Sequence, residues 1–249
     1  MKTSVVTGAA RGIGLATARR FHEMGWHVVM VDRDERQLMA ETSGFDNVEP
    51  VVCDVSRPDQ VSEMASGIAA CDALVNNAGV ADFGPIEETG FDRWRTVMET
   101  NLDGVFLMTQ ALLGPLEKTG GAIVNIASIS GLRASTLRVA YGTSKAGVMA
   151  LTRQQAVELG EKGVRANCVC PGPVRTKLAM AVHTREIIDA YHDAVPLNRY
   201  GTEDEIANVV TFLCSDAASY VTGQVISVDG GFEAAGIGLA ALRETGSRS

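Results

Sequence analysis

Short apolar runs rich in β-branched residues alternate along the chain with longer stretches whose apolar positions recur at helical spacing. Seven runs have the character of strands, at residues 5–6, 28–31, 51–53, 73–75, 122–126, 166–170 and 225–228. Intervening stretches, such as residues 13–24 and 140–159, are long enough for helices. This alternation predicts parallel strands joined by right-handed crossovers. Because the strand runs are apolar throughout, we expect helices on both faces of the sheet.

The chain of 249 residues shows no Pro-, Gly- or Ser-rich linker, no low-complexity tract and no short repeat. We therefore predict an α/β fold, with a single Rossmann-like, doubly wound parallel sheet of about seven strands spanning residues 1–249. Residues 175–202 form the longest stretch between the last strands, and their helical pattern is weak. They are predicted to be a substrate lid, in which His183 and His192 are exposed rather than catalytic.

Composition narrows the range of partners. The formal net charge is −8, and an acidic surface repels nucleic acid and anionic membranes, so neither is expected as a partner. No apolar run approaches the roughly 18 residues that a membrane span needs. Gly8 and Arg11 interrupt the apolar start of the chain too early for a signal peptide.

The five cysteines are odd in number and irregular in spacing, which is a poor basis for disulfides and favours a reducing, cytoplasmic compartment. Cys168 and Cys170 form a C-x-C pair that is conceivable as a metal site. The favoured interpretation is two small residues on one face of a buried strand. No set of His, Cys and carboxylate residues has ligand spacing, so no metal is predicted.

A glycine-rich stretch at residues 7–14 follows the first strand and opens the first helix. Gly8 would allow a tight turn, Gly12 would let the backbone approach a pyrophosphate, and Gly14 would let the helix pack on the strand. The phosphate charge would then meet the positive end of the helix dipole. A plain strand-to-helix turn is the alternative interpretation.

Asp32, at the end of the second strand, lies 18 positions after Gly14, about where a carboxylate holds the adenosine ribose. The same charge would repel a 2′-phosphate, so Asp32 favours NAD over NADP. The alternative is a helix N-cap, which Asp34 could provide equally well. Arg11 and Arg33 could neutralise a phosphate and keep NADP open as the less favoured cofactor.

Tyr141 and Lys145 are spaced i, i+4 in a predicted helix, so they share one face. A nearby ammonium favours the phenolate and lowers a tyrosine pKa from its usual value near 10. A surface pair is the alternative. Ser128 follows the fifth strand, however, and small or polar residues also follow the fourth and sixth strands, at 76–79 and 171–172. Ligands bind at this rim in doubly wound sheets.

These motifs, in this order from residue 7 to residue 231, resemble those of the short-chain dehydrogenase/reductase family. The resemblance implies a catalytic tetrad of Asn101, Ser128, Tyr141 and Lys145. It also implies an adenine-side contact at Asp54 and Val55, an Asn-Asn-Ala-Gly motif at 76–79, and nicotinamide-side contacts at 171–176. Together with the positions argued above, the predicted cofactor-binding residues are Gly8, Arg11, Gly12, Ile13, Gly14, Asp32, Arg33, Asp54, Val55, Asn77, Ala78, Gly79, Tyr141, Lys145, Pro171, Gly172, Val174 and Thr176.

The resemblance also implies a role for each member of the tetrad. Tyr141 as phenolate takes the hydroxyl proton of an alcohol while hydride leaves carbon for the nicotinamide. Lys145 lowers the tyrosine pKa and binds the nicotinamide ribose. Ser128 steadies the substrate oxygen, and Asn101 holds a water that links Lys145 to solvent. The predicted activity is hydride transfer between NAD and a secondary alcohol or ketone, such as a polyol, a sugar-like alcohol or a hydroxy acid.

The substrate pocket is predicted between residues 130–139, residues 80–84 and the lid, with Ser128, Ser130, Arg138 and Tyr141 facing the substrate. Arg138 stands three positions before Tyr141, and Arg133 lies in the same loop. We hypothesise that Arg138 binds an acidic group, which makes the substrate an anionic alcohol. The alternatives are a solvated arginine and an ion pair at a subunit interface.

Residues 232–242 continue the chain with small apolar residues that need a surface to bury against. The resemblance implies a homotetramer, with residues 232–249 as an interface tail and its last residues frayed.

Two other functions stay open. One is an NADPH-dependent 3-oxoacyl-thioester reductase acting on acyl carrier protein, and the other is a dinucleotide-sensing protein without turnover.

Overall fold

Seven parallel strands form one sheet in the order β3-β2-β1-β4-β5-β6-β7, as the sequence predicted. The computed structural model describes residues 1–176, 179–180 and 183–236. The strand bounds are β1 (Thr3–Thr7), β2 (His27–Asp32), β3 (Val48–Val52), β4 (Ala73–Asn76), β5 (Ala122–Ile126), β6 (Arg165–Pro171) and β7 (Val225–Val228). Chain order reverses between β1 and β4, which is the position where a doubly wound sheet opens a crevice for a ligand.

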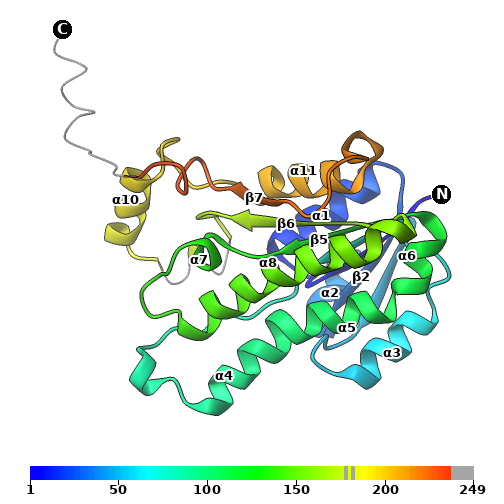
Figure 1. The fold of residues 1–249 in the computed structure, drawn as a ribbon, viewed down its shortest axis with the longest axis horizontal. Coiled ribbons are helices and arrows are strands. Elements are labelled where there is room, and N and C mark those ends of the chain that lie inside the picture. Colours follow the sequence, from blue (N-terminus) through cyan, green and yellow to red (C-terminus); the bar gives the residue numbers. More distant parts are fainter. Residues whose placement is uncertain (177–178, 181–182, 237–249) are drawn as a thin grey trace, which may run out of the picture.

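Helices cover both faces of this sheet (Figure 1). Helices α1 and α11 pack together on one face, while α3, α5 and α8 lie on the other. The helix bounds are α1 (Gly12–Glu23), α2 (Glu35–Thr42), α3 (Pro58–Ser66), α4 (Phe91–Met98), α5 (Gly104–Ala111), α6 (Leu113–Thr119), α7 (Ile129–Leu132), α8 (Val139–Leu159), α10 (Arg185–Ala194) and α11 (Glu203–Cys214). Short 3₁₀ turns occur at Ile86–Glu88, Gly160–Lys162 and Asp216–Ala218, and a π turn, η2 (Glu99–Asp103), joins α4 to α5.

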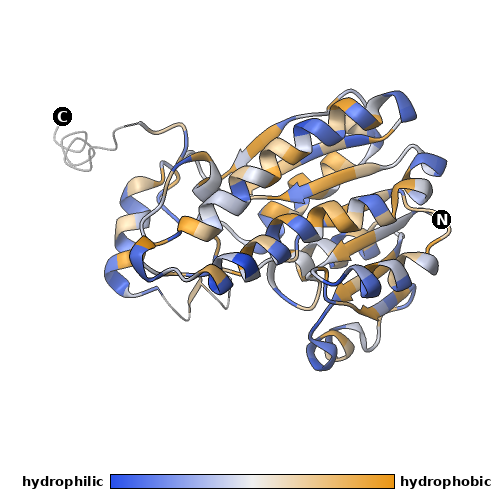
Figure 2. Cartoon of the chain, turned by 60° about the horizontal axis from the view of Figure 1, so that its bottom comes forward, coloured by the Kyte–Doolittle hydropathy of each residue, from blue (hydrophilic) through white to orange (hydrophobic). Residues whose placement is uncertain are grey.

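Consecutive strand residues enter two separate cores, which explains why the strand runs are apolar without alternation. Val6 packs in the core that contains Phe21 of α1 and Leu213 of α11, whereas Val5 packs in the core that contains Met108 of α5. All five side chains are fully buried, and each contributes roughly 1.5–3 kcal/mol by leaving water. Figure 2 shows the hydrophobic strands running between the helices.

The C-x-C pair takes the structural role that the sequence favoured. Cys168 and Cys170 of β6 are fully buried on the α8 side of the sheet, in a small core with Val148 and Met149. The five cysteines are all free and buried. Among the described residues, no group of His, Cys, Asp or Glu could hold a metal ion, and no helix is long and apolar enough to cross a membrane.

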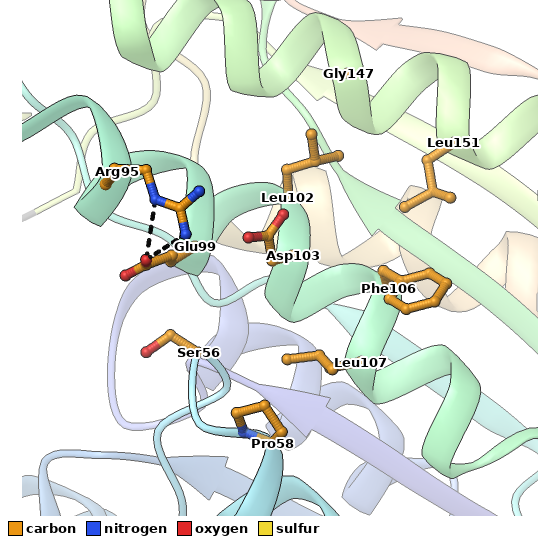
Figure 3. Close-up of a pocket in the computed structure, with 10 residues that line it drawn as sticks. All are labelled: Ser56, Pro58, Arg95, Glu99, Leu102, Asp103, Phe106, Leu107, Gly147 and Leu151. Atoms are coloured by element: carbon orange, nitrogen blue, oxygen red, sulfur yellow. Dashed lines mark hydrogen bonds and ion pairs between the residues drawn. The ribbon is translucent and has the colours of Figure 1, made fainter. Parts of the chain in front are cut away.

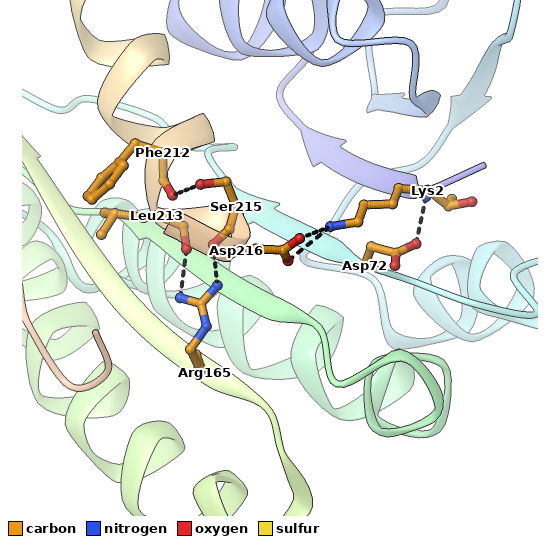
Figure 4. A network of polar contacts seen from close by, with 8 residues as sticks. Lys2, Asp72, Arg165, Phe212, Leu213, Ser215 and Asp216 are labelled. Atoms are coloured by element: carbon orange, nitrogen blue, oxygen red, sulfur yellow. Dashed lines mark hydrogen bonds and ion pairs between the residues drawn. The ribbon is translucent and has the colours of Figure 1, made fainter. Parts of the chain in front are cut away.

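The amino-terminal edge of the sheet is tied to the end of α11 by polar contacts (Figure 4). The Arg165 guanidinium donates to the backbone carbonyls of Leu213 and Ser215, at 2.7 and 3.2 Å, and so provides partners that the last turn of a helix lacks. Lys2 reaches Asp216 at 3.1 Å. At the other end, Thr202 and Glu205 form a capping box that starts α11 near the opposite edge of the sheet.

The predicted lid contains a regular helix, and the weak helical pattern expected for this segment is wrong for α10, because Ile187, Ile188 and Tyr191 recur at helical spacing. The Thr184 hydroxyl caps α10, and Arg185 pairs with Asp189 one turn later, so local polar contacts add to this apolar pattern. The expectation that His183 and His192 are exposed is wrong, because both are half-buried against the ring of Tyr200.

The predicted interface tail is described only at its start, because residues 237–249 lie outside the described part of the chain. Within that start, Phe232 lies 6.5 Å from the ring of Tyr191 in α10. The first residues of the tail therefore contact the lid helix of their own chain, and the role of the tail in an interface stays a prediction.

Candidate active site

The turn between β1 and α1 requires its three glycines. Gly8 and Gly12 have φ of +63° and +59°, in the left-handed region that side chains disfavour. A Cβ on Gly14 would stand 2.2 Å from the carbonyl oxygen of Gly8, so only glycine lets α1 approach β1 this closely. The cap residue Arg11 offers no side-chain hydrogen bond to the start of α1, and no acidic residue occupies the first turn. The helix start thus suits an anionic ligand.

Asp32 faces this turn from the end of β2. Its carboxylate accepts hydrogen bonds from the backbone amides of Ala10 and Asp34, each at 3.0 Å. Asp34, not Asp32, caps α2 by accepting from the Gln37 amide at 3.1 Å, which also lowers the pKa of Asp34. The helix-cap interpretation of Asp32 is therefore wrong, and its carboxylate is oriented toward the glycine turn.

Both arginines that could have neutralised a 2′-phosphate lie beside carboxylates. Arg11 is hydrogen-bonded to Asp34, and Arg33 lies 3.5 Å from Asp54. Burial would raise the pKa of Asp54, but hydrogen bonds from Ser56 and the charge of Arg33 hold it below its ordinary value. Next to it, the Val55 side chain is buried and packs tightly against Gly104.

The residues after β4 connect the glycine turn to the catalytic side. Asn77 donates to the carbonyls of Thr7 and Gly8, at 3.0 and 3.1 Å, and the Thr7 hydroxyl accepts from the amide of Ala78. A Cβ on Gly79 would lie 3.2 Å from Asn101 Oδ1 and 3.5 Å from Lys145 Nζ. The Asn-Asn-Ala-Gly motif thus lies between the predicted cofactor turn and the predicted tetrad.

Asn101 is held by the irregular π turn η2, a form that is frequent at functional sites. Its side chain accepts from the Val80 amide at 2.8 Å and donates to the Val80 carbonyl at 2.9 Å and to Ser144 Oγ at 3.1 Å. Asn101 thereby fixes the loop after β4 against α8. Ser144 has no part in the predicted motifs, and its place one residue before Lys145 is the only signal for it in the sequence.

Ser128, Tyr141 and Lys145 come together beyond the carboxyl end of β5, as predicted. The Ser128 hydroxyl, which accepts from the Ser130 amide at 3.1 Å, is also hydrogen-bonded to the Tyr141 phenol. The Lys145 ammonium lies 5.8 Å from the centre of the Tyr141 ring and donates to the Ile126 carbonyl at 2.7 Å. Lys145 is 4 % exposed, so almost no water reaches its charge.

Burial dominates the protonation of this group. It raises the pKa of Tyr141 above its ordinary value, although the Ser128 hydrogen bond and the charge of Arg138 act in the opposite direction. Burial also lowers the pKa of Lys145 to about 8. The net direction is therefore upward, opposite to the lowering expected from Lys145, because burial outweighs the effect of nearby cations on the pKa of Tyr141.

The loop after β6 completes the rim. The amide of Gly172, just after Pro171, donates to the Val228 carbonyl at 3.0 Å, and a Cβ on Gly172 would lie 2.6 Å from the backbone of Asp229. Val174 is buried and pairs with Gly201. The Thr176 hydroxyl accepts from the Ala179 amide at 3.1 Å. The predicted contacts at residues 171–176 thus end at the start of the lid.

The predicted substrate segments meet. Gly84 and Arg138 form an isolated bridge that joins residues 80–84 to residues 130–139. Arg138 lies over two rings, with its guanidinium carbon 4.6 Å from the centre of Phe83 and 5.7 Å from that of Tyr141. Ser130 is buried and accepts from the Ser135 hydroxyl at 3.1 Å. Sequence reasoning did not single out Phe83, because the pairing of the two loops leaves no local pattern.

A large surface hollow lies elsewhere, between α4, α5 and α8 (Figure 3). It has a volume of about 630 Å³ and is bordered by Arg95, Glu99, Phe106 and Leu151 among others. None of the predicted catalytic or cofactor-binding residues lines it. The predicted site residues therefore lie at the rim of the sheet and outside this hollow.

Comparison with known proteins agrees with this geometry. Residues 8–233 match the family model described as enoyl-(acyl carrier protein) reductase. The chain is 36 % identical to the 3-oxoacyl-[acyl-carrier-protein] reductase FabG of Chlamydia trachomatis, over 92 % of this chain and 96 % of the relative. It is also 36 % identical to the meso-2,3-butanediol dehydrogenase of Serratia marcescens, over 92 % and 94 %.

A solved structure of a short-chain type dehydrogenase/reductase from Mycobacterium ulcerans superposes with a TM-score of 0.90 at 30 % identity, covering 94 % of this chain and 90 % of that one. The sheet order, the glycine turn and the Ser128–Tyr141–Lys145 group are thus accompanied by similarity along nearly the whole chain. The protein belongs to the short-chain dehydrogenase/reductase family of oxidoreductases.

Proposed function

We propose that the protein transfers hydride between NAD and a secondary alcohol or ketone, with Tyr141 as the acid and base. The observation that carries this proposal is the close grouping of a half-buried Tyr141 with the buried Ser128 and Lys145, at the strand ends where the glycine turn also opens. When bound, a nicotinamide supplies the ring carbon that accepts or returns the hydride. The protein residues bind, orient and move the proton.

In the oxidative direction, the Tyr141 phenolate takes the hydroxyl proton of the alcohol, and the C–O bond becomes a carbonyl as hydride leaves the same carbon. The hydroxyl of Ser128 donates to the substrate oxygen and holds it beside the phenol. Lys145, which is deprotonated more easily than an exposed lysine, is suited to pass the proton onward from Tyr141. In the reductive direction, each proton moves the opposite way.

The preference for NAD is supported by the charges around the glycine turn. Asp32 presents a carboxylate that is not used as a helix cap, whereas Arg11 and Arg33 lie beside Asp34 and Asp54. Titration of the purified protein with NADH and NADPH, followed by fluorescence, should give tighter binding of NADH. Replacing Asp32→Ser should weaken NADH roughly tenfold or more and leave NADPH no weaker than before. Tighter NADPH in the unmodified protein would contradict the preference.

Reduction of 3-oxoacyl thioesters with NADPH is the second candidate. It is supported by the description of the matching family model and by the name of the Chlamydia relative. Asp32 opposes it because it disfavours the 2′-phosphate. If acetoacetyl-thioester is reduced with NADPH faster than any simple ketone is reduced with NADH, thioester reduction is favoured over the NAD-dependent activity.

A dinucleotide sensor without turnover has less support, because a protein that only binds the cofactor has no need of Ser128, Tyr141 and Lys145 together. Failure to oxidise or reduce any carbonyl pair, together with tight cofactor binding, would favour the sensor.

The proposed assembly is a homotetramer in the cytoplasm. Five free, buried thiols support a reducing compartment. Phe106 is 49 % exposed beside the hollow between α4, α5 and α8, and such an apolar surface suits contact with another subunit. Light scattering of the purified protein tests the assembly, and the mass of a monomer would overturn it.

A further inference from the structure

Arg138 is a cation at the mouth of the site whose hydrogen-bonding capacity is not used by the described part of the chain. Its guanidinium forms no ion pair and no side-chain hydrogen bond with any described residue. One face lies over Phe83 at 4.6 Å, and the same group is 5.7 Å from the centre of the Tyr141 ring. Stacking occupies the face of a guanidinium and leaves its in-plane N–H donors available.

Two charged neighbours of Arg138 in the described part of the chain are engaged with other partners. Asp82 precedes Phe83, but its carboxylate binds Arg93 at 2.6 Å. Arg133, in the same loop as Arg138, pairs with Glu233 at 2.7 Å. His183 and Tyr141 are titratable groups near Arg138, and burial together with the Arg138 charge lowers the pKa of His183, which favours its neutral ring.

The backbone around Arg138 is also held in a costly conformation. Leu137 has φ of +61°, in the left-handed region that a bulky side chain disfavours. The Leu137 carbonyl accepts from the Gly84 amide at 3.0 Å, which fixes the loop against residues 80–84. A hydrogen bond from Gly142 to the Arg138 carbonyl, at 2.7 Å, then begins the helix that carries Tyr141. Arg138 is thus placed by the same turn that places the catalytic tyrosine.

We propose that Arg138 determines substrate specificity by binding a carboxylate of the substrate. The carboxylate is attached either directly to the carbinol carbon or to the carbon next to it. The substrates are then hydroxy acids and their keto acids. The claim that these acids are substrates rests on the proposed function, whereas the claim that Arg138 binds their carboxylate does not. A planar fork of N–H donors matches a carboxylate in bidentate geometry, and the ring of Phe83 covers the contact from one side.

The test compares each keto acid with its carboxamide, which has a similar shape but no charge. Protein saturated with the oxidised dinucleotide is titrated by calorimetry with pyruvate and pyruvamide, and then with acetoacetate and acetoacetamide. No redox step occurs, because ligand and cofactor are both oxidised. For at least one pair the acid should bind tighter by roughly tenfold or more.

Two variants locate the source of any preference. Arg138→Met should abolish the difference between acid and amide, and Arg138→Lys should retain part of it because a single point charge replaces the fork. Arg133→Met is the matched control, since that arginine is already paired, and it should keep the full preference. Equal binding of acid and amide, no binding of either acid, or a preference that survives Arg138→Met would overturn the inference.

Failure of the proposed reaction and failure of the proposed specificity give different results. If keto acids bind through Arg138 but no hydroxy acid is oxidised, the binding site stands and the reaction is wrong. If neutral diols are oxidised while acids have no advantage, the reaction stands and the specificity is wrong. A third role, in which Arg138 only favours the Tyr141 phenolate, predicts that Arg138→Met shifts the pH profile for all substrates equally.

Discussion

Strand β5 and helix α8 meet at two polar clusters, one made of neutral amides and hydroxyls and one that contains the proposed catalytic residues. In the first, the Asn125 amide nitrogen donates to Thr152 Oγ1 at 2.9 Å and to Gln155 Oε1 at 2.7 Å. Its amide oxygen accepts from Asn76 of β4 at 2.9 Å, and Gln155 continues to Thr109 of α5 at 3.0 Å. These neutral groups provide one another with partners, so they are buried without charge.

The second cluster lies further along the same two elements. Lys145 is as well buried as Gln155, yet it carries an ionisable group whose pKa burial has lowered to about 8. Tyr141 has its pKa raised by the same cause. Charge is therefore costly here, and the hydrogen bond from Lys145 to the Ile126 carbonyl offsets only part of that cost. The cluster around Asn125 therefore stabilises the fold, whereas burying the ionisable groups of Lys145 and Tyr141 lowers its stability.

The largest expected effect is on turnover. Tyr141→Phe removes the proton-transfer group while keeping the ring, so kcat should fall roughly 10²–10⁴-fold, or about 3–5 kcal/mol. Cofactor affinity and Tm should stay near those of the unmodified protein. Tyr200→Phe is the matched control, because Tyr200 is a buried tyrosine whose hydroxyl is hydrogen-bonded to the lid residue His183, at 2.9 Å. Equal activity in the two variants would remove Tyr141 from the mechanism.

Lys145→Met should abolish turnover and yet stabilise the fold at neutral pH. In the unfolded chain the lysine pKa is 10.5, and in the folded protein it is about 8. Below pH 8 both states are charged, and the folded state carries the whole cost of burial, about 3 kcal/mol. Between about pH 8 and 10.5 only the unfolded chain holds the proton, so the free energy of unfolding of the unmodified protein rises with pH.

Denaturant unfolding of both proteins at pH 7 and pH 10 measures this difference. The advantage of the Met variant should be largest at pH 7 and should shrink toward pH 10. A Met variant that is less stable than the unmodified protein at pH 7 would show that the contact with Ile126 outweighs the cost of burying the charge.

A substitution in the cluster around Asn125 should lower stability and spare turnover, which is opposite to the effect expected of Lys145→Met. Asn125→Leu keeps the branching of the side chain but leaves Gln155 Oε1 and the Asn76 amide without Asn125 as a partner, so the free energy of unfolding should fall by about 2 kcal/mol. The kcat of the folded enzyme should change little, because Asn125 touches none of the reacting groups. Urea unfolding and steady-state kinetics on the same preparation test both halves. A large loss of kcat at full stability would mean that the two clusters are coupled.

The sequence predicted the sheet and the close approach of Tyr141 and Lys145 because both leave local patterns. Buried parallel strands appear in the sequence as apolar runs. The i, i+4 spacing places Tyr141 and Lys145 on one face of α8 whatever surrounds them. The glycine turn was predictable for the same reason, since Gly8 and Gly12 adopt backbone angles that only glycine adopts easily.

What the sequence did not predict depends on contacts between distant segments. The position of Phe83 over Arg138 follows from the pairing of two loops more than fifty residues apart, and no local pattern records it. The burial of His183 likewise depends on Tyr200, which follows the lid helix. The direction of the Tyr141 pKa was mistaken because spacing places Lys145 nearby but says nothing about desolvation, which dominates.

The smallest expected effect concerns Leu137, whose strained backbone belongs to the catalytic end of the contact. Leu137→Gly allows φ of +61° without a steric cost, so the free energy of unfolding should rise by up to about 1 kcal/mol, less what the looser unfolded chain gains in entropy. The side chain is 49 % exposed, so little burial is lost. Asn47, at φ of +59°, gives the matched control, because asparagine tolerates this region and Asn47→Gly should change stability less. Thermal unfolding of both variants decides the point. If the two shift Tm equally, Leu137 stores no particular strain, and the cost of the catalytic end lies in its buried ionisable groups alone.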